Sequence, residues 1–321
     1  MLRTAAAGFS LALALCGSAV AQAWPDRPIK LVVGFTPGGA ADYVGRSVGD
    51  ALGRALGQPV VIDNKPGAGS SLAADFVAHA PPDGYTVLIA SPSAISVNPA
   101  LDPKRAPSVQ SLVPVAKLTA SPLVVAANPQ LGIRSIPELI EYTKKNPGKV
   151  NFAHAGMGSA PHLGGVLFNQ LAGTDLVPIP FKGGAPSVQS VIAGDTQVTF
   201  ATPPSVLPQI KGGRLVGLAV TTTERFPLVP DLPGMKESGL PAYRMDFWYG
   251  FFVPAGTPPE IVKKLFDATA VALARPEVKA ALAREGTDVS ASASPAEFAD
   301  FLQAEGRFWA KLAKDSGAKA D

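Results

Sequence analysis

Short apolar segments and amphipathic segments alternate along the chain from about residue 29. The first apolar segment ends in the glycine loop Pro37-Gly38-Gly39, and apolar residues then recur at helical spacing up to Gly57. The alternation continues to residue 90, which predicts the order β-α-β-α-β for this part of the chain. The predicted strands are residues 29–35, 60–62 and 85–90, and the predicted helices are residues 44–56 and 72–80.

A second series of the same kind begins near residue 123. Residues 150–171 repeat the strand, glycine loop and helix plan of residues 30–56, so we interpret this series as a second lobe. Such alternation predicts mostly parallel sheets covered by helices, with ligands beyond the carboxyl ends of the strands. The predicted strands are residues 123–127, 150–153, 176–179, 197–201, 215–220 and 247–253, and the predicted helices begin near residues 136, 162, 187, 258 and 295.

The first 23 residues have the pattern of a secretory signal peptide. Arg3 is their only charged residue, residues 5–14 are almost wholly apolar, and Ala21-Gln22-Ala23 precedes Trp24 as a cleavage motif. The apolar run is shorter than the roughly 20 residues that span a bilayer. The single cysteine, Cys16, lies in this segment. We therefore expect a periplasmic protein that has no disulfide and no thiol in its mature form.

Composition and motifs exclude several classes of function. With 47% hydrophobic and 17% charged residues the chain can form a core, and a net charge of +3 without a basic block argues against nucleic-acid partners. The three histidines form no HExxH or other metal-ligand pair, and the one GxSxG match, residues 45–49, lies inside a predicted helix. We predict no catalytic residue, no metal and no cofactor.

The glycine loops at residues 36–41 and 156–159 each deliver the end of a strand to the start of a helix. The first turn of a helix has unpaired N–H groups and a partial positive charge, which favour a carboxylate or a phosphate. If both loops face one crevice, two helix ends hold an anion without a basic side chain. Each loop taken alone is equally consistent with an ordinary tight turn.

Polar residues beside these loops have a structural and a ligand-binding interpretation. Asp42 is favoured in a first helical turn by the dipole alone, or it pairs with a ligand hydroxyl or amino group. Ser159 caps a helix, and a cap at a ligand-facing helix is also a donor. The same two interpretations apply to His162, Ser91, Ser93, Lys182 and Thr202.

Seven short motifs in order resemble the tripartite tricarboxylate transporter receptors, also called Bug-type solute-binding proteins. They cover essentially the whole chain after residue 23, and they are WPDRPI at 24–29, FTPGGAAD at 35–42, NKPGAG at 64–69, PDGYT at 82–86, AGMGS with HL at 155–163, FKG at 181–183 and PAGTP at 254–258. The resemblance implies an α/β, two-lobed, type II-like periplasmic-binding-protein fold. It implies a small carboxylate ligand and possible membrane transporter subunits as partners.

The resemblance also assigns site residues. Thr36, Gly38, Gly39, Ala40 and Asp42 would form one jaw, and Gly156, Gly158, Ser159 and His162 the other. Phe35, Ser91, Ser93 and Thr202 complete the expected site. Phe181 stands where the family frequently has tyrosine, and Asp246 where a small or neutral residue is commoner. A negative charge at Asp246 would disfavour a second carboxylate on the ligand and favour an amine, a hydroxyl or a neutral ring.

We therefore expect a binding protein that closes on its ligand. Lobe 1 comprises residues 24–121 and 244–321, lobe 2 comprises residues 122–243, and two chain crossings near Ser121 and Arg244 act as the hinge. A monomer is favoured. Two alternatives stay open, an exported enzyme acting on a small organic acid and a sensor subunit that binds only proteins.

Overall fold

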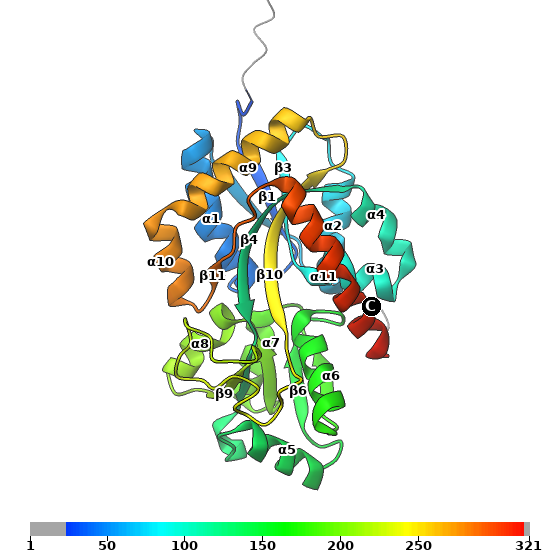
Figure 1. Cartoon of the computed structure of the whole chain (residues 1–321), viewed down its shortest axis with the longest axis vertical. Helices are drawn as coiled ribbons and strands as arrows, with labels where there is room; N and C mark the ends of the chain where they lie inside the picture. The colour runs from blue at the N-terminus through cyan, green and yellow to red at the C-terminus, as the bar shows by residue number, and fades with distance from the viewer. Residues whose placement is uncertain (1–23, 318–321) are drawn as a thin grey trace, which may run out of the picture.

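The structure is a computed structural model that describes residues 24–317, apart from the side chains of residues 105–107. The predicted signal peptide, residues 1–23, lies outside the described residues. The described chain forms two sheets with helices packed around each, one above the other in Figure 1. We call the elements around the six-stranded sheet the six-stranded half and those around the five-stranded sheet the five-stranded half.

The six-stranded sheet combines strands from both ends of the described chain in the order β11-β4-β10-β3-β1-β2. Strand β1 pairs in parallel with β2 and β3, whereas β10 is antiparallel to β3 and β4, and β11 is antiparallel to β4. The strands are β1 Ile29–Val33, β2 Val60–Asn64, β3 Thr86–Ala90, β4 Leu112–Pro122, β10 Asp246–Pro254 and β11 Asp288–Val289.

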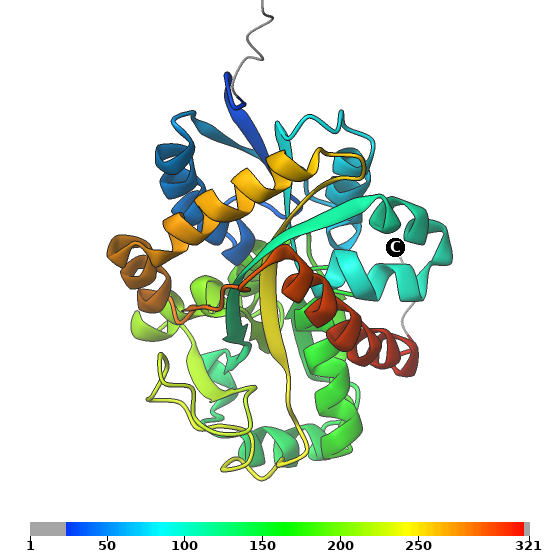
Figure 2. The same cartoon turned by 45° about the horizontal axis from the view of Figure 1, so that its top comes forward.

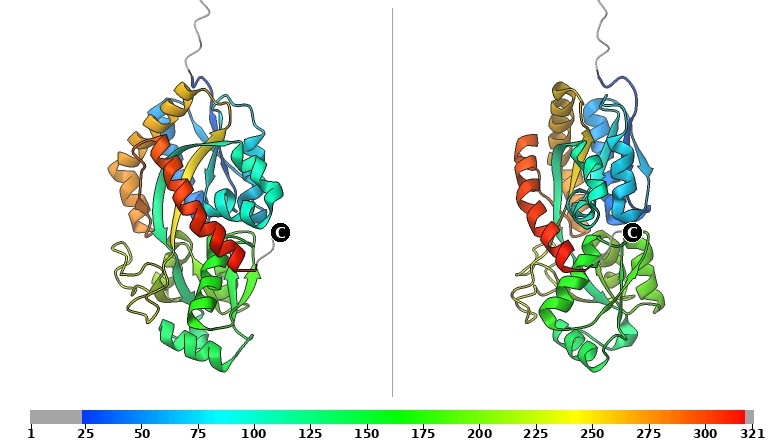
Figure 3. Two further views of the ribbon diagram at one scale, coloured as in Figure 1. Left: turned by 45° about the vertical axis from the view of Figure 1, so that its right-hand side comes forward. Right: turned by 90° about the vertical axis from the view of Figure 1, so that its right-hand side faces the viewer.

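Helices cover both faces of this sheet because its strands bury residues on both sides. Leu31 and Val33 share a core with Val48 of α1 and Leu265 of α9, whereas Val32 lies in a separate core with residues of α2 and α11. Figures 2 and 3 show α11 crossing the sheet away from α1. The helices are α1 Ala40–Leu56, α2 Ser71–Ala78, α3 Asn98–Leu101, α4 Ala106–Gln110, α9 Pro259–Ala274, α10 Pro276–Arg284 and α11 Pro295–Asp315, with short helical turns η1 Ala68–Ser70, η2 Ser93–Val97 and η3 Pro103–Arg105.

The five-stranded sheet has the order β7-β6-β8-β5-β9 and lies wholly within the middle of the chain. Strand β6 is parallel to β7 and β8, and β5 is antiparallel to β8 and β9. Its strands are β5 Val124–Ala127, β6 Asn151–His154, β7 Val177–Pro180, β8 Val198–Ala201 and β9 Val216–Val220, and its helices are α5 Ile136–Lys145, α6 Ala160–Ala172, α7 Gly184–Ala193 and α8 Pro203–Lys211, with the turn η4 Pro129–Leu131.

The predicted fold class is confirmed, with one correction. Both halves are α/β, but the sheets are mixed and not mostly parallel, because β10 enters the first sheet antiparallel and β5 enters the second antiparallel. These are the strands next to the two places where the chain passes between the halves. A strand that arrives from the other half, and not through a covering helix, is free to pair antiparallel.

The two chain crossings lie side by side. Pro122 at the end of β4 pairs with Asp246 at the start of β10, and both strands run down the centre of the molecule (Figure 1). Thr221, fully buried, joins the two crossings: its hydroxyl accepts from the Leu123 amide at 2.7 Å and donates to the Met245 carbonyl at 2.8 Å. One side chain thus satisfies a backbone group on each crossing.

Candidate ligand-binding site

Four helix N-termini of the described chain converge on one cavity between the halves. Helix α1 comes from the six-stranded half, and α6, α7 and α8 come from the five-stranded half. The cavity is lined by Phe35, Gly39, Ala40, Ala41, Ser93, Ala155, Ser159, Ala160, Pro161, Gly184, Ser187, Ala201, Thr202, Phe247 and Tyr249. The loops that the sequence analysis placed on opposite jaws therefore do face a common space.

The loop before α1 is held in place by Asp42. Its carboxylate accepts from the Gly38 amide at 3.1 Å, from the Arg46 guanidinium at 3.0 Å and from the Asn64 side chain at 3.1 Å. Burial raises the pKa of Asp42, but the hydrogen bonds from Arg46, Gly38 and Asn64 outweigh it, and the pKa is lowered. Asp42 thus fixes the loop geometry and leaves the amides of Ala40 and Ala41, in the first turn, without intrahelical partners.

The start of α6 is braced by two buried histidines. The Ser159 hydroxyl caps the helix by accepting from the His162 amide at 3.3 Å, and the His162 Nδ1 accepts from the Gly158 amide at 3.4 Å. His154 Nδ1 lies 3.0 Å from the Gly156 carbonyl. Burial lowers the pKa of His162 to about 4, and burial together with the neighbouring His162 lowers that of His154 to about 3. Both rings are neutral at pH 7.

Helices α7 and α8 add two further N-termini at the cavity, next to Lys182 and Thr202, for which the sequence analysis gave both a structural and a ligand-binding interpretation. Gly183 precedes α7 with a φ of 148°, and a Cβ there would lie 2.5 Å from the Thr36 hydroxyl of the other half. Glycine is required at this close approach. Helix α8 begins with Pro203 and Pro204 after Thr202, so its first turn contributes the helix dipole but few N–H donors.

The cavity carries no charged side chain. Its polar lining consists of helix-terminal backbone and of hydroxyls, and Phe247 and Tyr249 of β10 form an aromatic wall. The Ser93 hydroxyl is the notable group, because Ser93 is 1% exposed and its Oγ has no hydrogen-bond partner in the described structure. A serine hydroxyl can both donate and accept a hydrogen bond, so this group has unused hydrogen-bonding capacity at the cavity.

The predicted site residues fall into three groups. Those that line the cavity are Phe35, Gly39, Ala40, Ser93, Ser159 and Thr202. Gly156 and Phe181 line a second cavity that shares Phe35 with the first. Those that line neither are Thr36, Gly38, Asp42, Ser91, Gly158, His162 and Asp246.

Asp246 lies at the surface beside the chain crossing. Its carboxylate is half exposed and lies 3.4 Å from the Arg244 guanidinium. A carboxylate that is paired with arginine and lies outside the cavity does not bring a negative charge next to a bound ligand. The expected exclusion of a second carboxylate by Asp246 therefore finds no support in the structure.

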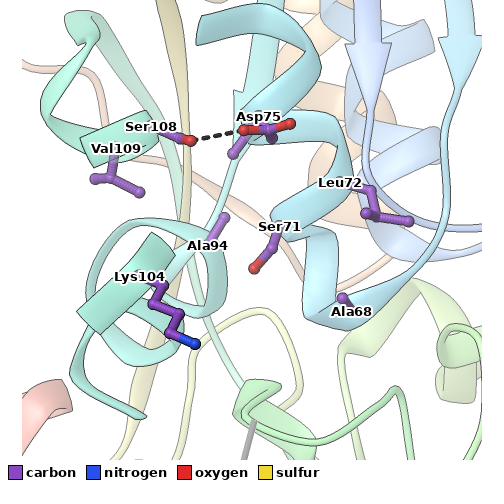
Figure 4. A pocket seen from close by; sticks show the side chains of 9 residues that line it. Ala68, Ser71, Leu72, Asp75, Ala94, Lys104, Ser108 and Val109 are labelled. Atoms are coloured by element: carbon purple, nitrogen blue, oxygen red, sulfur yellow. Dashed lines mark hydrogen bonds between the residues drawn. The ribbon is translucent and has the colours of Figure 1, made fainter. Parts of the chain in front are cut away.

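A further hollow lies on the six-stranded half alone, between α2 and α4 (Figure 4). Three of its polar side chains are already engaged: the Ser108 hydroxyl donates to Asp75 at 2.6 Å, and the Ser71 hydroxyl accepts from Asn98 at 2.6 Å. It offers no helix terminus shared between the halves. This hollow therefore lacks the arrangement that the sequence analysis expects of a ligand site.

The described residues hold neither a metal cluster nor a membrane-spanning helix. No group of three or more His, Cys, Asp or Glu side chains there is arranged to hold a metal ion. None of the helices between residues 24 and 317 combines the length and the apolar character needed to cross a bilayer.

Comparison with known proteins identifies the family. Residues 44–317 match the family described as "Tripartite tricarboxylate transporter family receptor". The chain belongs to this receptor family. It is 35% identical over 304 residues to protein BugT of Bordetella pertussis, a match that covers 93% of this chain and 92% of BugT. The resemblance inferred from the sequence motifs is thereby confirmed.

Solved structures of the receptor family share the fold. Periplasmic binding protein BugD superposes with a TM-score of 0.88 at 32% identity and covers 93% of this chain and 100% of its own. An R. palustris protein with adipate gives 0.88 at 32% identity, covering 92% and 99% of the two chains. MatC from Rhodopseudomonas palustris with bound malate gives 0.85 at 33% identity, covering 90% and 100%.

Proposed function

We propose that the protein is a periplasmic receptor that captures a small carboxylate in the cavity between its two halves and presents it to membrane transporter subunits. The observation that carries this proposal is the convergence of four helix N-termini on a cavity without charged side chains. Each N-terminus contributes about 0.3–1 kcal/mol toward an anion, and up to about 2 kcal/mol where it is partly buried. The malate- and adipate-bound relatives support a carboxylate as the ligand.

Capture works by closure of the two lobes. Lobe 1 is residues 24–121 and 244–321, lobe 2 is residues 122–243, and the paired crossings at Pro122 and Asp246 are the hinge. The ligand touches both lobes only when they are closed, so its binding energy shifts the population toward the closed form. The working form is a monomer in the periplasm, and the signal-peptide pattern of residues 1–23 supports export.

The protein catalyses no reaction. A hydrolase would need a nucleophile and a base in contact at the cavity. Ser159 instead accepts a hydrogen bond from a backbone amide, and His162 Nδ1 is engaged by the Gly158 amide. In these hydrogen bonds both side chains stabilise the start of α6.

The test is calorimetry and thermal shift with a panel of mono- and dicarboxylates, amino acids and aromatic acids. A ligand at 100 times its Kd stabilises the protein by about 2.7 kcal/mol. Ser93→Ala should weaken binding about five- to tenfold without lowering the melting temperature, because the hydroxyl has no partner to lose in the free protein. Ser96→Ala, in the same helical turn and outside the cavity lining, is the matched control.

Three results would contradict the proposal. A protein that no acid of the panel stabilises is not a carboxylate receptor, and Ser93→Ala with unaltered affinity would show that the ligand lies elsewhere. Turnover of a bound acid that is abolished in His162→Ala would favour the enzyme alternative.

A further inference from the structure

Three of the four edges of the two described sheets are protected against pairing with another chain. Strand β11 has only two residues, and β7 contains Pro178 and Pro180, which lack the N–H group that a ladder needs. Strand β9 is covered by the loop that follows it, because the Val220 amide donates to the Pro233 carbonyl at 2.9 Å. The fourth edge is β2, at the end of the six-stranded sheet.

Strand β2 has none of these protections. Its five residues include neither proline nor lysine. The Pro59 carbonyl, just before β2, accepts from β1, and the Lys65 amide, just after β2, donates to β1. Because backbone groups alternate in direction along a strand, those of Val60, Ile62 and Asn64 point away from the sheet. No loop or side chain of the described structure hydrogen-bonds to these outward backbone groups.

An exposed apolar patch lies on one face of this edge. Val61 is 53% exposed, and Leu72 and Phe76 of α2 are 57% and 39% exposed. Lys30 is the partner of Val61 in the ladder between β1 and β2, and its Nζ lies 5.7 Å from the centre of the Phe76 ring. Val61 and Phe76 are therefore on the same side of the sheet. The Lys65 Nζ lies 4.3 Å from the centre of the same ring. Apolar patches with a polar rim are typical of protein-binding surfaces.

The patch also has an excess of positive charge. The Asp63 carboxylate lies 3.7 Å from the Lys30 Nζ and 3.4 Å from the Lys65 Nζ. In the described structure each of these lysines forms its ion pair with Asp63 alone. Two ammonium groups that share one carboxylate can accept a second, so the patch is complementary to an acidic side chain next to an apolar one.

The other face of β2 is apolar and carries no excess charge. Val60 and Ile62 line a groove there together with residues of α1. The charged residues of this groove, Arg46, Asp50 and Arg54, are all engaged in ion pairs within α1. Side chains alternate between the two faces along a strand. A strand added to β2 would thus place apolar residues in this groove and an apolar and an acidic residue on the patch.

We propose that β2, with Leu72 and Phe76 beside it, is a docking edge for a partner protein, which adds an extended segment of apolar and acidic residues to the six-stranded sheet. The backbone of β2 supplies the hydrogen bonds, and its two faces select the side chains of the segment. The inference does not depend on which carboxylate the protein captures, because no residue of β2 lines the ligand cavity.

The test uses synthetic peptides in which valine alternates with phenylalanine and glutamate, in either order, with serine flanks for solubility. Calorimetry measures their affinity, and hydrogen exchange followed by NMR locates the site. At least one order of residues should bind and slow exchange of the outward Ile62 amide about tenfold or more. Exchange of the Val61 amide, which already faces β1, should stay the same.

Substitutions on the patch should weaken peptide binding. Val61→Asp offers the lysines a competing carboxylate and repels the glutamate, so affinity should fall about fivefold, and Phe76→Ala should lower it by up to about fivefold. Val271→Asp and Phe308→Ala are the matched controls, because these residues are 53% and 41% exposed on α9 and α11. Both controls should bind the peptide like the parent protein. Lysine in place of glutamate in the peptide should also weaken binding about fivefold, and less so in high salt.

Three results would overturn the inference. Exchange at Ile62 that no peptide slows, or equal affinity for the glutamate and lysine peptides, would show that β2 does not dock such a segment. Exchange at Ile62 that slows with rising protein concentration, without peptide, would show that a second copy of the chain occupies the edge. None of these results bears on carboxylate binding, so the proposed function stands or falls by its own test.

Discussion

A side chain at position 158 in place of Gly158 should hinder closure of the two halves, although it does not contact the ligand. Gly158 lies in the five-stranded half with a φ of 70°, and a Cβ there would meet the Asn98 Oδ1 of the six-stranded half at 2.7 Å. Asn98 cannot move freely, because its amide also donates to Ala68, Gly69 and Ser71. The clash exists only when the two halves are together.

The expected loss of affinity depends on the clash with Asn98 and not on the backbone strain of the substitution. Alanine in the left-handed region costs about 1–2 kcal/mol, in open and closed forms alike. Loosening the buried Asn98 amide costs a further 1–3 kcal/mol, roughly the penalty for one unsatisfied buried group, and in the closed form only. Gly158→Ala should therefore bind a carboxylate about 5- to 150-fold more weakly than the parent protein.

Gly173→Ala is the matched control. Gly173 ends the same helix that follows Gly158, has a φ of 61°, and would place its Cβ in open space. Both variants should lower the melting temperature of the free protein by similar amounts, but only Gly158→Ala should lose affinity in calorimetry. Equal affinities for the two variants would refute the argument that Gly158 acts through contact between the halves.

Three further predictions concern residues outside the cavity. Acidification from pH 6.5 to about pH 4 should destabilise the protein, because the two histidines bind protons in the unfolded state and stay neutral when buried in the folded state. Each of His154 and His162 should lower the free energy of unfolding by about 2 kcal/mol at pH 5. Denaturant titrations of variants with asparagine in place of one histidine should show a flatter pH dependence. Asp246→Asn should change carboxylate affinity less than twofold by calorimetry, and a large gain for dicarboxylates would restore its predicted role. Thr221→Val should lower the free energy of unfolding by about 2–4 kcal/mol in denaturant titration, since a backbone amide and a carbonyl lose their partner, whereas Thr221→Ser should retain most of it.

The ligand-facing loops could be predicted because their chemistry is local. A β-branched run, a glycine loop and an amphipathic segment in succession determine where a strand ends and a helix begins, and Gly39 and Ser159 indeed stand at the N-caps of α1 and α6. Parallel strands then bring such loops to one edge of a sheet. The site follows from these two steps without any knowledge of side-chain contacts.

Elements whose formation depends on distant partners could not be predicted in this way. Strand β4 was not expected, because its third residue is Pro114 and it mixes polar with apolar residues. It forms because β10, more than a hundred residues later, pairs along its whole length. Helix α8 starts with two prolines and contains Pro208, a composition that indicates a turn. Its N-cap, Thr202, was predicted as a site residue because it follows a strand end, and the helix itself was not predicted.

The same distinction explains why the ligand class is harder to predict than the site. A carboxylate held by backbone groups requires only glycines and the starts of helices, and both can be recognised in a sequence. The choice among carboxylates would fall to side chains that line the cavity, such as Ser93 and Phe247, which come from separate segments and meet only in the folded chain. Since the Ser93 hydroxyl has no structural partner, this residue can be exchanged with little loss of stability. A receptor built in this way can change its ligand while its helix termini and its closing motion stay the same.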